Sequence, residues 1–516
     1  METNIGLLLA KRAELNTHVE ALVDHASGRR FTFSALDERA NRIANALRAL
    51  GVRKGDRVAI LMMNGTEFVE SFFGLAKIGA VVVPLNWRLV PDELEYIVKN
   101  AGATVLLYGS DFFDNVGELH RRGLDATDLN LWIEVGGGER RHGFSACYDA
   151  LLEAASPTPV AIDAVDDDLL FIMYTSGTTG LPKGSVHSHE SFLWSVMTFT
   201  ITAELRFKDR YAIALPMFHV GALLPVVINV YRGATNVMLR EFDPKVMWEL
   251  IERERITATL AVPSMLNFML LVPGFERYDY SSLRWIISGA TPVPVTLIER
   301  YAAIGIEVHQ AYGLTESGGP ACLISPDDAL KRIGSTGKAF FHTEVRVVDE
   351  QGNNTEPGVP GELIVRGRHI MKGYWRNPEA TAETIRDGWL YTGDVAIVDE
   401  DGFITIHDRT KDMIISGGEN VYPAEIENTV MQHPAVAEVA VIGVPSERWG
   451  ESPLAVVVAK SGQALSETDV LTHCEGKLAR FKLPKRAVFV DAIPRNPTGK
   501  ALKRVLREQF PDHASE

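Results

Sequence analysis

Cysteine is scarce in this chain. Only Cys147, Cys322 and Cys474 occur among 516 residues, and their wide separation matches neither a metal-ligand spacing nor a disulfide framework. Unpaired thiols are typical of proteins from a reducing compartment. We therefore expect a cytoplasmic protein in which each cysteine is a small core residue.

Long apolar runs and an excess of positive charge are also lacking. The nearest approach to a membrane span, residues 75–85, is interrupted by Lys77 and is shorter than the roughly 20 apolar residues that a spanning helix needs. Lys and Arg number 52 against 67 Asp and Glu, so the net charge is −15. This balance argues against a general affinity for nucleic acid or an anionic membrane. We expect no transmembrane segment and no nucleic-acid partner, and a polyanionic ligand needs a local basic site.

Most of the chain alternates between patterns typical of strands and of helices. Residues 35–50 have apolar side chains at helical spacing, and apolar runs such as 56–62 and 80–84 predict buried strands. This alternation is typical of parallel sheets with crossover helices. Residues 110–165 lack it and are expected to be irregular. From residue 334 onward, alternating strands and tight turns predict a small antiparallel barrel or sheet.

At 516 residues the chain is too long for a single core. The dense charged cluster at residues 408–412 lies between two apolar runs and predicts a domain boundary. We expect an α/β N-terminal domain at residues 1–408, with parallel and mixed sheets, helices and the small barrel. A hinge at residues 409–412 and a small, mobile α+β C-terminal domain at residues 413–516 complete the predicted organisation.

One loop has the composition of a phosphate site. Residues 174–184 combine five hydroxyl side chains, three glycines and Lys183, directly after an apolar run that predicts a buried strand. Glycines let the backbone approach a ligand closely, while hydroxyls, N–H groups and an ammonium bind anionic oxygens. The order is not that of a Walker A loop, because Leu181 and Pro182 separate Gly180 from Lys183. A flexible linker is the alternative, although linkers rarely place a proline beside a lysine among threonines.

Further polar loops follow other predicted strands. Residues 215–221 are expected to end a strand at His219, and residues 285–292 and 308–316 to form strands that open into glycine-containing turns. Ligands of open parallel sheets bind at such carboxyl ends. The ring of Tyr312 suits stacking on a nucleobase, and a carboxylate such as Glu316 beside phosphates indicates Mg²⁺. Each loop also has a purely structural interpretation, and a lone histidine near apolar residues is more often structural than catalytic.

Two features of the C-terminal third have alternative interpretations. Asp394 is suited to bind the vicinal hydroxyls of a ribose, or it is an ordinary turn aspartate. Residues 477–510 contain ten Lys or Arg against two acids, which reverses the overall charge and indicates a face that meets an anionic partner. A solvated helix face is the alternative for Lys503, Arg504 and Arg507. Lys500 follows two prolines and a glycine that restrict the shape of its loop.

Together these motifs resemble those of the adenylate-forming enzymes, the superfamily of acyl-CoA synthetases, luciferases and non-ribosomal adenylation domains. The resemblance runs from about residue 5 to residue 508, with its motifs in the expected order at residues 174–184, 216–221, 312–316, 391–394, 408–412 and 497–500. Within the superfamily, residues 414–423 look most like fatty and related acyl-CoA ligases. The resemblance implies a two-step reaction that uses ATP, Mg²⁺ and coenzyme A. A small-molecule carboxylic acid first becomes acyl-AMP with release of pyrophosphate, and the CoA thiol then displaces AMP.

The resemblance also implies roles for particular residues. It assigns the phosphates to Thr175, Ser176, Gly177, Thr178, Thr179, Gly180 and Lys183. It assigns phosphate and Mg²⁺ together to Thr315, Glu316 and Thr175. It places adenine among Gly289, Ala290, Tyr312 and Gly313, and the ribose on Asp394 and Arg409. Because the first step depends on positioning and on neutralising charge, Lys500 is expected to bridge the attacking carboxylate and the α-phosphate.

For the second step, the resemblance implies a rotation of the C-terminal domain about a hinge at Lys411. The rotation withdraws Lys500 and brings residues 416–419, including Gly417 and Gly418, to the pantetheine tunnel. The residues assigned to CoA are Trp449, Arg480, Phe481 and Lys482.

The acid itself is expected to lie beside His219. Some long-chain enzymes of the superfamily carry a gating tryptophan four residues after this histidine, where this chain has Leu223. Val220, Gly221 and Met265 are further candidate walls of an apolar pocket. We expect a medium-chain, long-chain or bulky apolar acid.

Several alternatives stay open at the level of sequence. An enzyme that hands the acyl group to a carrier protein, and an aryl-CoA ligase, share the same first step. A non-catalytic acyl-nucleotide sensor and a luciferase-like oxygenase are more distant alternatives. A homodimer is compatible with the sequence.

Overall fold

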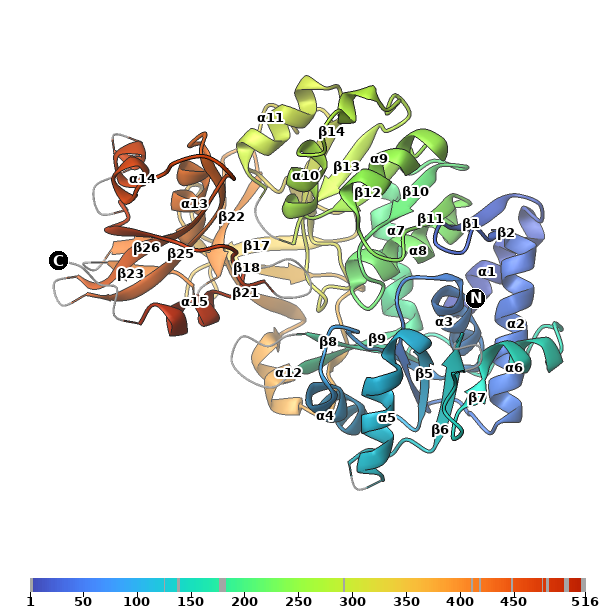
Figure 1. Cartoon of the computed structure of the whole chain (residues 1–516). Coiled ribbons are helices and arrows are strands. Elements are labelled where there is room, and N and C mark those ends of the chain that lie inside the picture. The colour runs from blue at the N-terminus through green and yellow to red at the C-terminus, as the bar shows by residue number, and fades with distance from the viewer. Residues whose placement is uncertain are drawn as a thin grey trace.

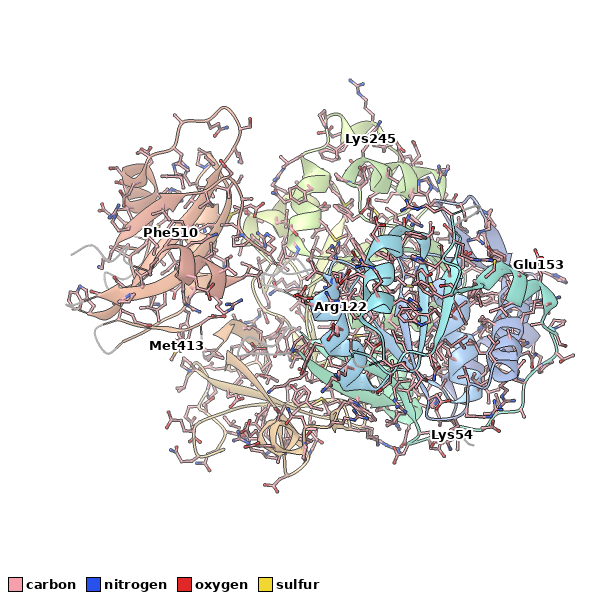
Figure 2. All side chains as sticks on the ribbon, turned by 60° about the horizontal axis from the view of Figure 1, so that its bottom comes forward. Lys54, Arg122, Glu153, Lys245, Met413 and Phe510 are labelled. Atoms are coloured by element: carbon pink, nitrogen blue, oxygen red, sulfur yellow. The ribbon has the colours of Figure 1, made fainter. Side chains whose placement is uncertain are left out.

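The structure is a computed structural model. It describes residues 3–124, 126–136, 140–175, 182–290, 293–409, 412–416, 419–446, 449–475, 477–478, 482–495 and 501–511. Figure 1 shows a large body, coloured blue to light orange, and a smaller body in darker orange and red at its left. Figure 2 shows Met413 and Phe510 on the smaller body, with Arg122, Glu153 and Lys54 on the large one.

The first sheet of the large body is mostly parallel, as the alternation of patterns predicts. Its strands run in the order β16 (Lys338–Ala339), β15 (Cys322–Leu323), β14 (Glu307–Tyr312), β13 (Trp285–Ser288), β12 (Ala258–Ala261), β10 (Arg210–Ile213), β11 (Thr235–Met238), β1 (Glu20–Asp24) and β2 (Arg30–Thr32). The pairs from β14 to β1 are parallel, and those at both edges are antiparallel. The carboxyl ends of β12, β13 and β14 therefore meet at one edge.

The second sheet is also mixed. Its strands run in the order β19 (Gly373–Tyr374), β9 (Lys183–Ser188), β8 (Leu169–Thr175), β4 (Val81–Pro84), β3 (Arg57–Leu61), β5 (Val105–Gly109), β6 (Leu131–Val135) and β7 (Ala146–Cys147). β8 and β9 form an antiparallel pair in which Thr175 lies opposite Lys183. Lys183 therefore begins a strand at the end of the predicted phosphate loop.

Helices cover both faces of the two sheets. The main core lies between the sheets and includes buried side chains from α1 (Ile5–Leu15), α2 (Phe33–Ala49), α3 (Thr66–Ile78), α7 (His189–Thr202) and α8 (Val220–Arg232). The other face of the first sheet packs against α9 (Pro244–Arg253), α10 (Pro263–Leu270) and α11 (Val295–Ala303). The other face of the second packs against α4 (Pro91–Ala101) and α5 (Phe113–Arg122). α6 (Tyr148–Ala154) packs on α2, and α12 (Pro378–Thr384) on β19.

Two smaller, mostly antiparallel units complete the fold. The first contains β17 (Glu344–Val348), β18 (Gly361–Arg366), β21 (Trp389–Val398), β20 (Ile385–Arg386) and β22 (Ile404–Arg409). The C-terminal unit contains β24 (Glu419–Val421), β23 (Ile414–Ser416), β26 (Gly450–Ala459), β25 (Val436–Ser446) and β27 (Arg486–Phe489). α13 (Pro423–Met431) and α14 (Glu467–Cys474) pack on one face of this last sheet, and α15 (Lys503–Gln509) packs on the other. The architecture confirms the predicted fold class.

The predicted boundary at residues 409–412 falls between β22, which ends at Arg409, and β23, which begins at Ile414. The limits of the domains and the position of the hinge stay predictions.

Two local predictions are wrong. Residues 110–165 are not irregular, because they contain α5, β6, β7 and α6. These elements are short, and α5 buries only Val116 and Leu119 in a mostly polar and charged sequence, so no apolar run marks it. Residues 215–221 do not end a strand, because β10 ends at Ile213 and a loop follows. The Asn64 side chain satisfies that loop's backbone by donating to the Leu215 carbonyl and accepting from the Met217 N–H, at 2.8 and 2.9 Å.

Within the described ranges, no helix combines the length and the apolar character needed to cross a membrane. Lys77, inside the most apolar run, is buried and donates to Asp37 and Asn41 at 2.5 and 2.6 Å. All three cysteines are free thiols. Cys322 and Cys474 are buried as expected, whereas Cys147 is only partly so.

Candidate functional site

The backbone is unusually close-packed at the carboxyl ends of β13 and β14. A Cβ added to Gly289 would lie 2.5 Å from the carbonyl oxygen of Ala311, and one added to Gly313 would lie 1.5 Å from that of Gly319. Only glycine permits such approaches. Ala290 has a φ of 69°, a left-handed conformation that costs about 1 kcal/mol or more for a residue with a side chain. Strain of this kind is typical of functional sites.

Two buried polar atoms at this edge have no partner among the described residues. They are Oγ of Ser288 and Oε1 of Gln310. The two residues lie opposite each other in neighbouring parallel strands, so their side chains are on the same face of the sheet. Buried polar atoms are nearly always hydrogen-bonded, and a ligand with donors and acceptors would satisfy this pair. Of the two residues, Gln310 also lines the neighbouring cleft.

Tyr312 and Asp394 come together from different sheets. The Tyr312 hydroxyl donates a 2.5 Å hydrogen bond to Oδ2 of Asp394. Burial and the neighbouring carboxylate raise the pKa of Tyr312 well above its ordinary value, so the phenol keeps its proton. Asp394 lies opposite Arg409 in the antiparallel pair β21 and β22. The backbone therefore brings together the two residues that are predicted to bind the ribose. The Arg409 side chain is outside the described part of the chain.

A second cluster joins Lys183, Glu316 and Tyr374. The Tyr374 hydroxyl donates a 2.8 Å hydrogen bond to Oε1 of Glu316. The Lys183 ammonium lies 5.2 Å from the centre of the Tyr374 ring, within cation–π distance. Thr175 belongs to the same corner, because its hydroxyl donates to the Lys183 carbonyl at 3.4 Å. The cluster combines an ammonium, a hydroxyl and a carboxylate, which suits a phosphate chain with its counter-cation.

Sequence reasoning missed Tyr374. It occupies the two-residue strand β19, whose pairing with β9 places it opposite Ser185. The only sequence signal is a glycine followed by aromatic residues at 373–375, which is too common to assign a role.

The cluster also limits how a cation would be held. Among the described residues, no group of three or more His, Cys, Asp or Glu side chains is arranged to bind a metal ion. Mg²⁺ prefers several oxygen ligands and commonly takes many of them from substrate phosphates. The predicted ligands Glu316 and Thr175 therefore fit a cation that arrives with a polyphosphate.

His219 lies at the start of α8, as its N-cap residue. Its Nε2 atom is buried and has no partner among the described residues. Burial and the positive charge of Arg88 lower the pKa of His219 to about 3, so the ring is neutral near pH 7. Its ring centre is 4.3 Å from that of Phe218. A neutral ring with an unpaired nitrogen suits contact with a polar ligand group.

The candidate acyl-binding residues divide between two cores. Val220, Gly221 and Leu223 form the first turn of α8 and adjoin the main core. A Cβ added to Gly319 would lie 2.8 Å from Leu224 Cδ2, so this turn packs against the loop that follows Glu316. Met265 instead belongs to the core of α9, α10 and α11, on the other face of the first sheet. The structure does not bring Met265 together with Leu223.

A cleft of about 590 Å³ lies between the large body and the C-terminal unit. One wall carries Ala290, Gln310, Tyr312, Gly313 and Asp394, and the opposite wall is formed by side chains of α13 together with Arg495, Ala501 and Lys503. Arg495 and Ala501 pair through their backbones in an isolated bridge. The segment between them contains Lys500, which lies outside the described residues.

Other predicted residues are not at this cleft or are not described. Trp449 is 41% exposed, and its backbone N–H donates to Oγ of Ser446 at 3.2 Å. Lys482 donates to both carboxylate oxygens of Glu425 at 2.8 Å. Neither residue lines the cleft. The predicted residues outside the described ranges are Ser176, Gly177, Thr178, Thr179, Gly180, Lys411, Gly417, Gly418, Arg480, Phe481 and Lys500.

Comparison with known proteins assigns the family. Residues 9–375 match the model of the AMP-binding enzymes, and residues 425–500 match that of the AMP-binding enzyme C-terminal domain. The chain is 44% identical over 507 residues to the long-chain-fatty-acid–CoA ligase FadD13 of Mycobacterium tuberculosis, covering 98% of both chains. It is 39% identical over 507 residues to the feruloyl-CoA synthase of an Amycolatopsis species, covering 98% of this chain and 99% of the relative. The crystal structure of ATP-bound MatB from Rhodopseudomonas palustris superposes with a TM-score of 0.89 at 32% identity, covering 99% of both chains.

The cleft and the strand-end loops thus belong to a nucleotide-binding enzyme. Its N-terminal and C-terminal segments each match the sequence model of one family domain. The chain is a member of the AMP-binding enzyme family.

Proposed function

We propose that the cleft is the place where an apolar carboxylic acid is activated with ATP before it is joined to coenzyme A. The enzyme is an AMP-forming acid–CoA ligase. A carboxylate oxygen attacks the α-phosphorus of ATP and pyrophosphate leaves. The CoA thiol then attacks the acyl carbonyl and AMP leaves.

The observation that carries this proposal is the composition of the two cleft walls. Ala290, Gln310 and Tyr312 offer a strained turn, an unsatisfied amide and an aromatic ring for adenine, with Asp394 beside them for the ribose. Arg495 and Ala501, which flank the segment with Lys500, line the opposite wall. The cleft between these walls is therefore a place where a bound nucleotide and the attacking carboxylate could be held together.

The first step needs charge neutralisation more than covalent chemistry. Lys183, the Tyr374 hydroxyl and the hydroxyl side chains of the loop at residues 174–184 would bind the phosphate chain. Glu316 and Thr175 would hold Mg²⁺, which supplies neutralisation of the phosphate charge. Lys500 supplies a positive charge between the acid and the α-phosphate, a role that suits a lysine on a flexible stem.

The second step uses a different face of the C-terminal domain. Trp449 and Lys482 are candidates to bind CoA, yet neither lines the cleft. We therefore infer a rotation about residues 409–412, with Lys411 as the hinge, that exchanges the Lys500 segment for residues 416–419. Arg480 and Phe481 complete the proposed CoA site.

The acid would lie against the first turn of α8. Leu223 and the neighbouring Leu224 are buried apolar residues, and the neutral His219 ring stands at the start of the helix. These surroundings support a medium-chain, long-chain or bulky apolar acid. One relative is named as a long-chain-fatty-acid–CoA ligase, in line with such an acid, and another as a feruloyl-CoA synthase, in line with the aryl-CoA alternative.

The cellular setting is also part of the proposal. We place the enzyme in the cytoplasm, where ATP and CoA are available and the free Cys147, Cys322 and Cys474 stay reduced. Exposed Phe341 and Ile201 offer apolar surface for a homodimer, which light scattering would detect.

An acid panel tests the proposal. Purified enzyme receives Mg·ATP, CoA and single acids from C2 to C18, benzoate, ferulate or a bicyclic acid, and mass spectrometry detects the products. We expect a CoA thioester and AMP, with the highest kcat/KM on an apolar acid. A preference for benzoate or ferulate would support the aryl-CoA rival. Acyl-AMP without any thioester would identify an enzyme that serves another acceptor, and no turnover of any acid would contradict the proposal.

A further inference from the structure

Three consecutive backbone carbonyls at the Glu316 turn each accept a hydrogen bond from a distant part of the chain. Nε2 of His187 donates to the Thr315 carbonyl at 2.8 Å. The N–H of Met371 donates to the Glu316 carbonyl at 2.8 Å. Nδ1 of His369 donates to the Ser317 carbonyl at 2.7 Å. The turn lies outside regular secondary structure, so these bonds replace the ladder that a strand would provide.

The partners of the two histidines define their tautomers. A carbonyl only accepts, so His187 carries its proton on Nε2 and leaves Nδ1 facing the Ser191 hydroxyl at 3.4 Å. His369 carries its proton on Nδ1, and its Nε2 accepts from the Thr343 hydroxyl at 2.8 Å. The two rings therefore use opposite nitrogens for the same task.

Both rings are fully buried and neutral. Neither His187 nor His369 exposes any surface. Burial lowers the pKa of each to about 4, against a weaker opposing effect from its carbonyl partner. A neutral imidazole has a single N–H, so each ring donates a hydrogen bond to one carbonyl only.

The histidines and the turn are packed directly against each other. A Cβ added to Gly318 would lie 3.2 Å from Cε1 of His187 and 2.9 Å from the His369 carbonyl oxygen. Gly318 has a φ of 66°, so the turn depends on glycine there. Movement of the His187 ring, or of the His369 ring through its bond to the Ser317 carbonyl, would therefore be transmitted to the backbone beside Glu316.

We propose that His187 and His369 are positioning residues that fix the backbone on both sides of Glu316, so that its carboxylate meets the Tyr374 hydroxyl and the phosphate–Mg²⁺ group. This inference rests on the proposed function, because it assigns Glu316 to Mg·ATP. Groups that orient the ligands of a metal commonly affect affinity or activity about 10- to 100-fold when they are removed.

The opposite tautomers give a test that separates positioning from simple packing. The amide nitrogen of Gln reaches about as far as Nε2 of His, and that of Asn about as far as Nδ1. His187→Gln and His369→Asn therefore keep the donor, whereas His187→Asn and His369→Gln misplace it. His189 supplies a matched control, since it is also buried and neutral, yet its Nδ1 accepts from the Ile5 N–H.

The readouts are the Mg²⁺ dependence of acid-dependent ATP–pyrophosphate exchange and the binding of Mg·ATP by calorimetry. We expect His187→Asn and His369→Gln to raise the half-saturating Mg²⁺ concentration, or weaken Mg·ATP binding, by about tenfold or more. His187→Gln, His369→Asn and His189→Asn should stay within about threefold of the wild type. If Gln and Asn behave alike at both positions, or the preference is reversed, the inference is wrong.

The two readouts distinguish failure of the proposed function from failure of the inference about the histidines. Wild-type enzyme that binds Mg·ATP but exchanges no pyrophosphate with any acid would contradict the proposed function. The donor pattern would still be decided by the binding data. If one substitution prevents folding, the Gln and Asn variants at the other histidine decide the outcome.

Discussion

Tyr374 and Glu316, which are 58 positions apart in the sequence, share a 2.8 Å hydrogen bond between the phenol and a carboxylate oxygen. The pairing of β19 with β9 brings Tyr374 to this position, and β9 begins with Lys183. One short strand pair therefore joins the end of the predicted phosphate loop to the predicted Mg²⁺ carboxylate. The proposed chemistry depends on this junction.

Removing the Tyr374 hydroxyl should weaken the use of Mg·ATP. A hydrogen bond to a charged group contributes about 1.5 to 3 kcal/mol, so Tyr374→Phe should lower kcat/KM for ATP by about tenfold or more. Steady-state kinetics at fixed acid and CoA measure the effect. Tyr108→Phe is the control, since it removes a buried hydroxyl bonded to Glu134 and Ser145 on the second sheet. Equal kinetic losses in both variants would exclude a specific role for Tyr374.

Asp394 should be needed for the ribose rather than for the fold of the unit that contains β21. Asp394→Asn keeps the shape of the side chain but removes the negative charge of the carboxylate that accepts the Tyr312 hydrogen bond. We expect the KM for ATP to rise by about tenfold or more, with a smaller rise for 2′-deoxy-ATP. The same rise for both nucleotides would place Asp394 away from the 2′-hydroxyl.

Gly289 should tolerate no side chain. In Gly289→Ala the new Cβ meets the Ala311 carbonyl at 2.5 Å, so one of the two strand ends must shift at a cost of about 1 to 3 kcal/mol. ATP binding measured by calorimetry should weaken by about tenfold or more. Gly143→Ala is the matched control, because no atom lies within 4 Å of its added Cβ. Unchanged ATP binding by Gly289→Ala would show that adenine does not approach this strand end.

Buried neutral histidines should make the fold sensitive to mild acid. The pKa is lowered to about 4 in His187, His189 and His369, mainly by burial. An unfolded histidine binds its proton near pH 6.5, so between about pH 6.5 and pH 4 the unfolded chain binds more protons than the folded one. The free energy of unfolding therefore falls as the pH is lowered through this window, by about 1 kcal/mol per histidine at pH 5.5.

Urea denaturation of the wild type and of His189→Asn at pH 7.5 and pH 5.5 measures this contribution. The variant cannot be protonated at position 189, so its loss on acidification should be smaller than that of the wild type. An identical loss in both proteins would show that His189 titrates normally in the folded state.

Sequence reasoning placed most of its candidate site residues where predicted strands end. Residues 174–184, Tyr312 and Glu316 carry local signals, because glycines and polar groups accumulate where buried strands end. Asp394 instead lies within β21. The fold class followed from the same alternation. The elements at residues 110–165 escaped because they are short and α5 is mostly polar and charged.

Other site features depend on pairing across the chain and have no local signal. Tyr374 acquires its partner only when β19 joins β9, and the unsatisfied pair of Ser288 and Gln310 exists only in the register of β13 and β14. The roles of His187 and His369 likewise require the fold, since a histidine in an apolar setting gives no indication of which carbonyl it binds. Met265 is a candidate wall of the acyl pocket because it is apolar, and the structure places it in another core.

The most direct test of the central claim is a comparison of the two half-reactions in Lys500→Ala. Acyl-AMP formation is measured from acid and Mg·ATP, and thioester formation is measured separately from supplied acyl-AMP and CoA. The account predicts that the variant loses the first reaction by about 100-fold or more, because it lacks the charge at the α-phosphate, and keeps the second within about threefold. Equal loss of both reactions, or normal acyl-AMP formation, would contradict it.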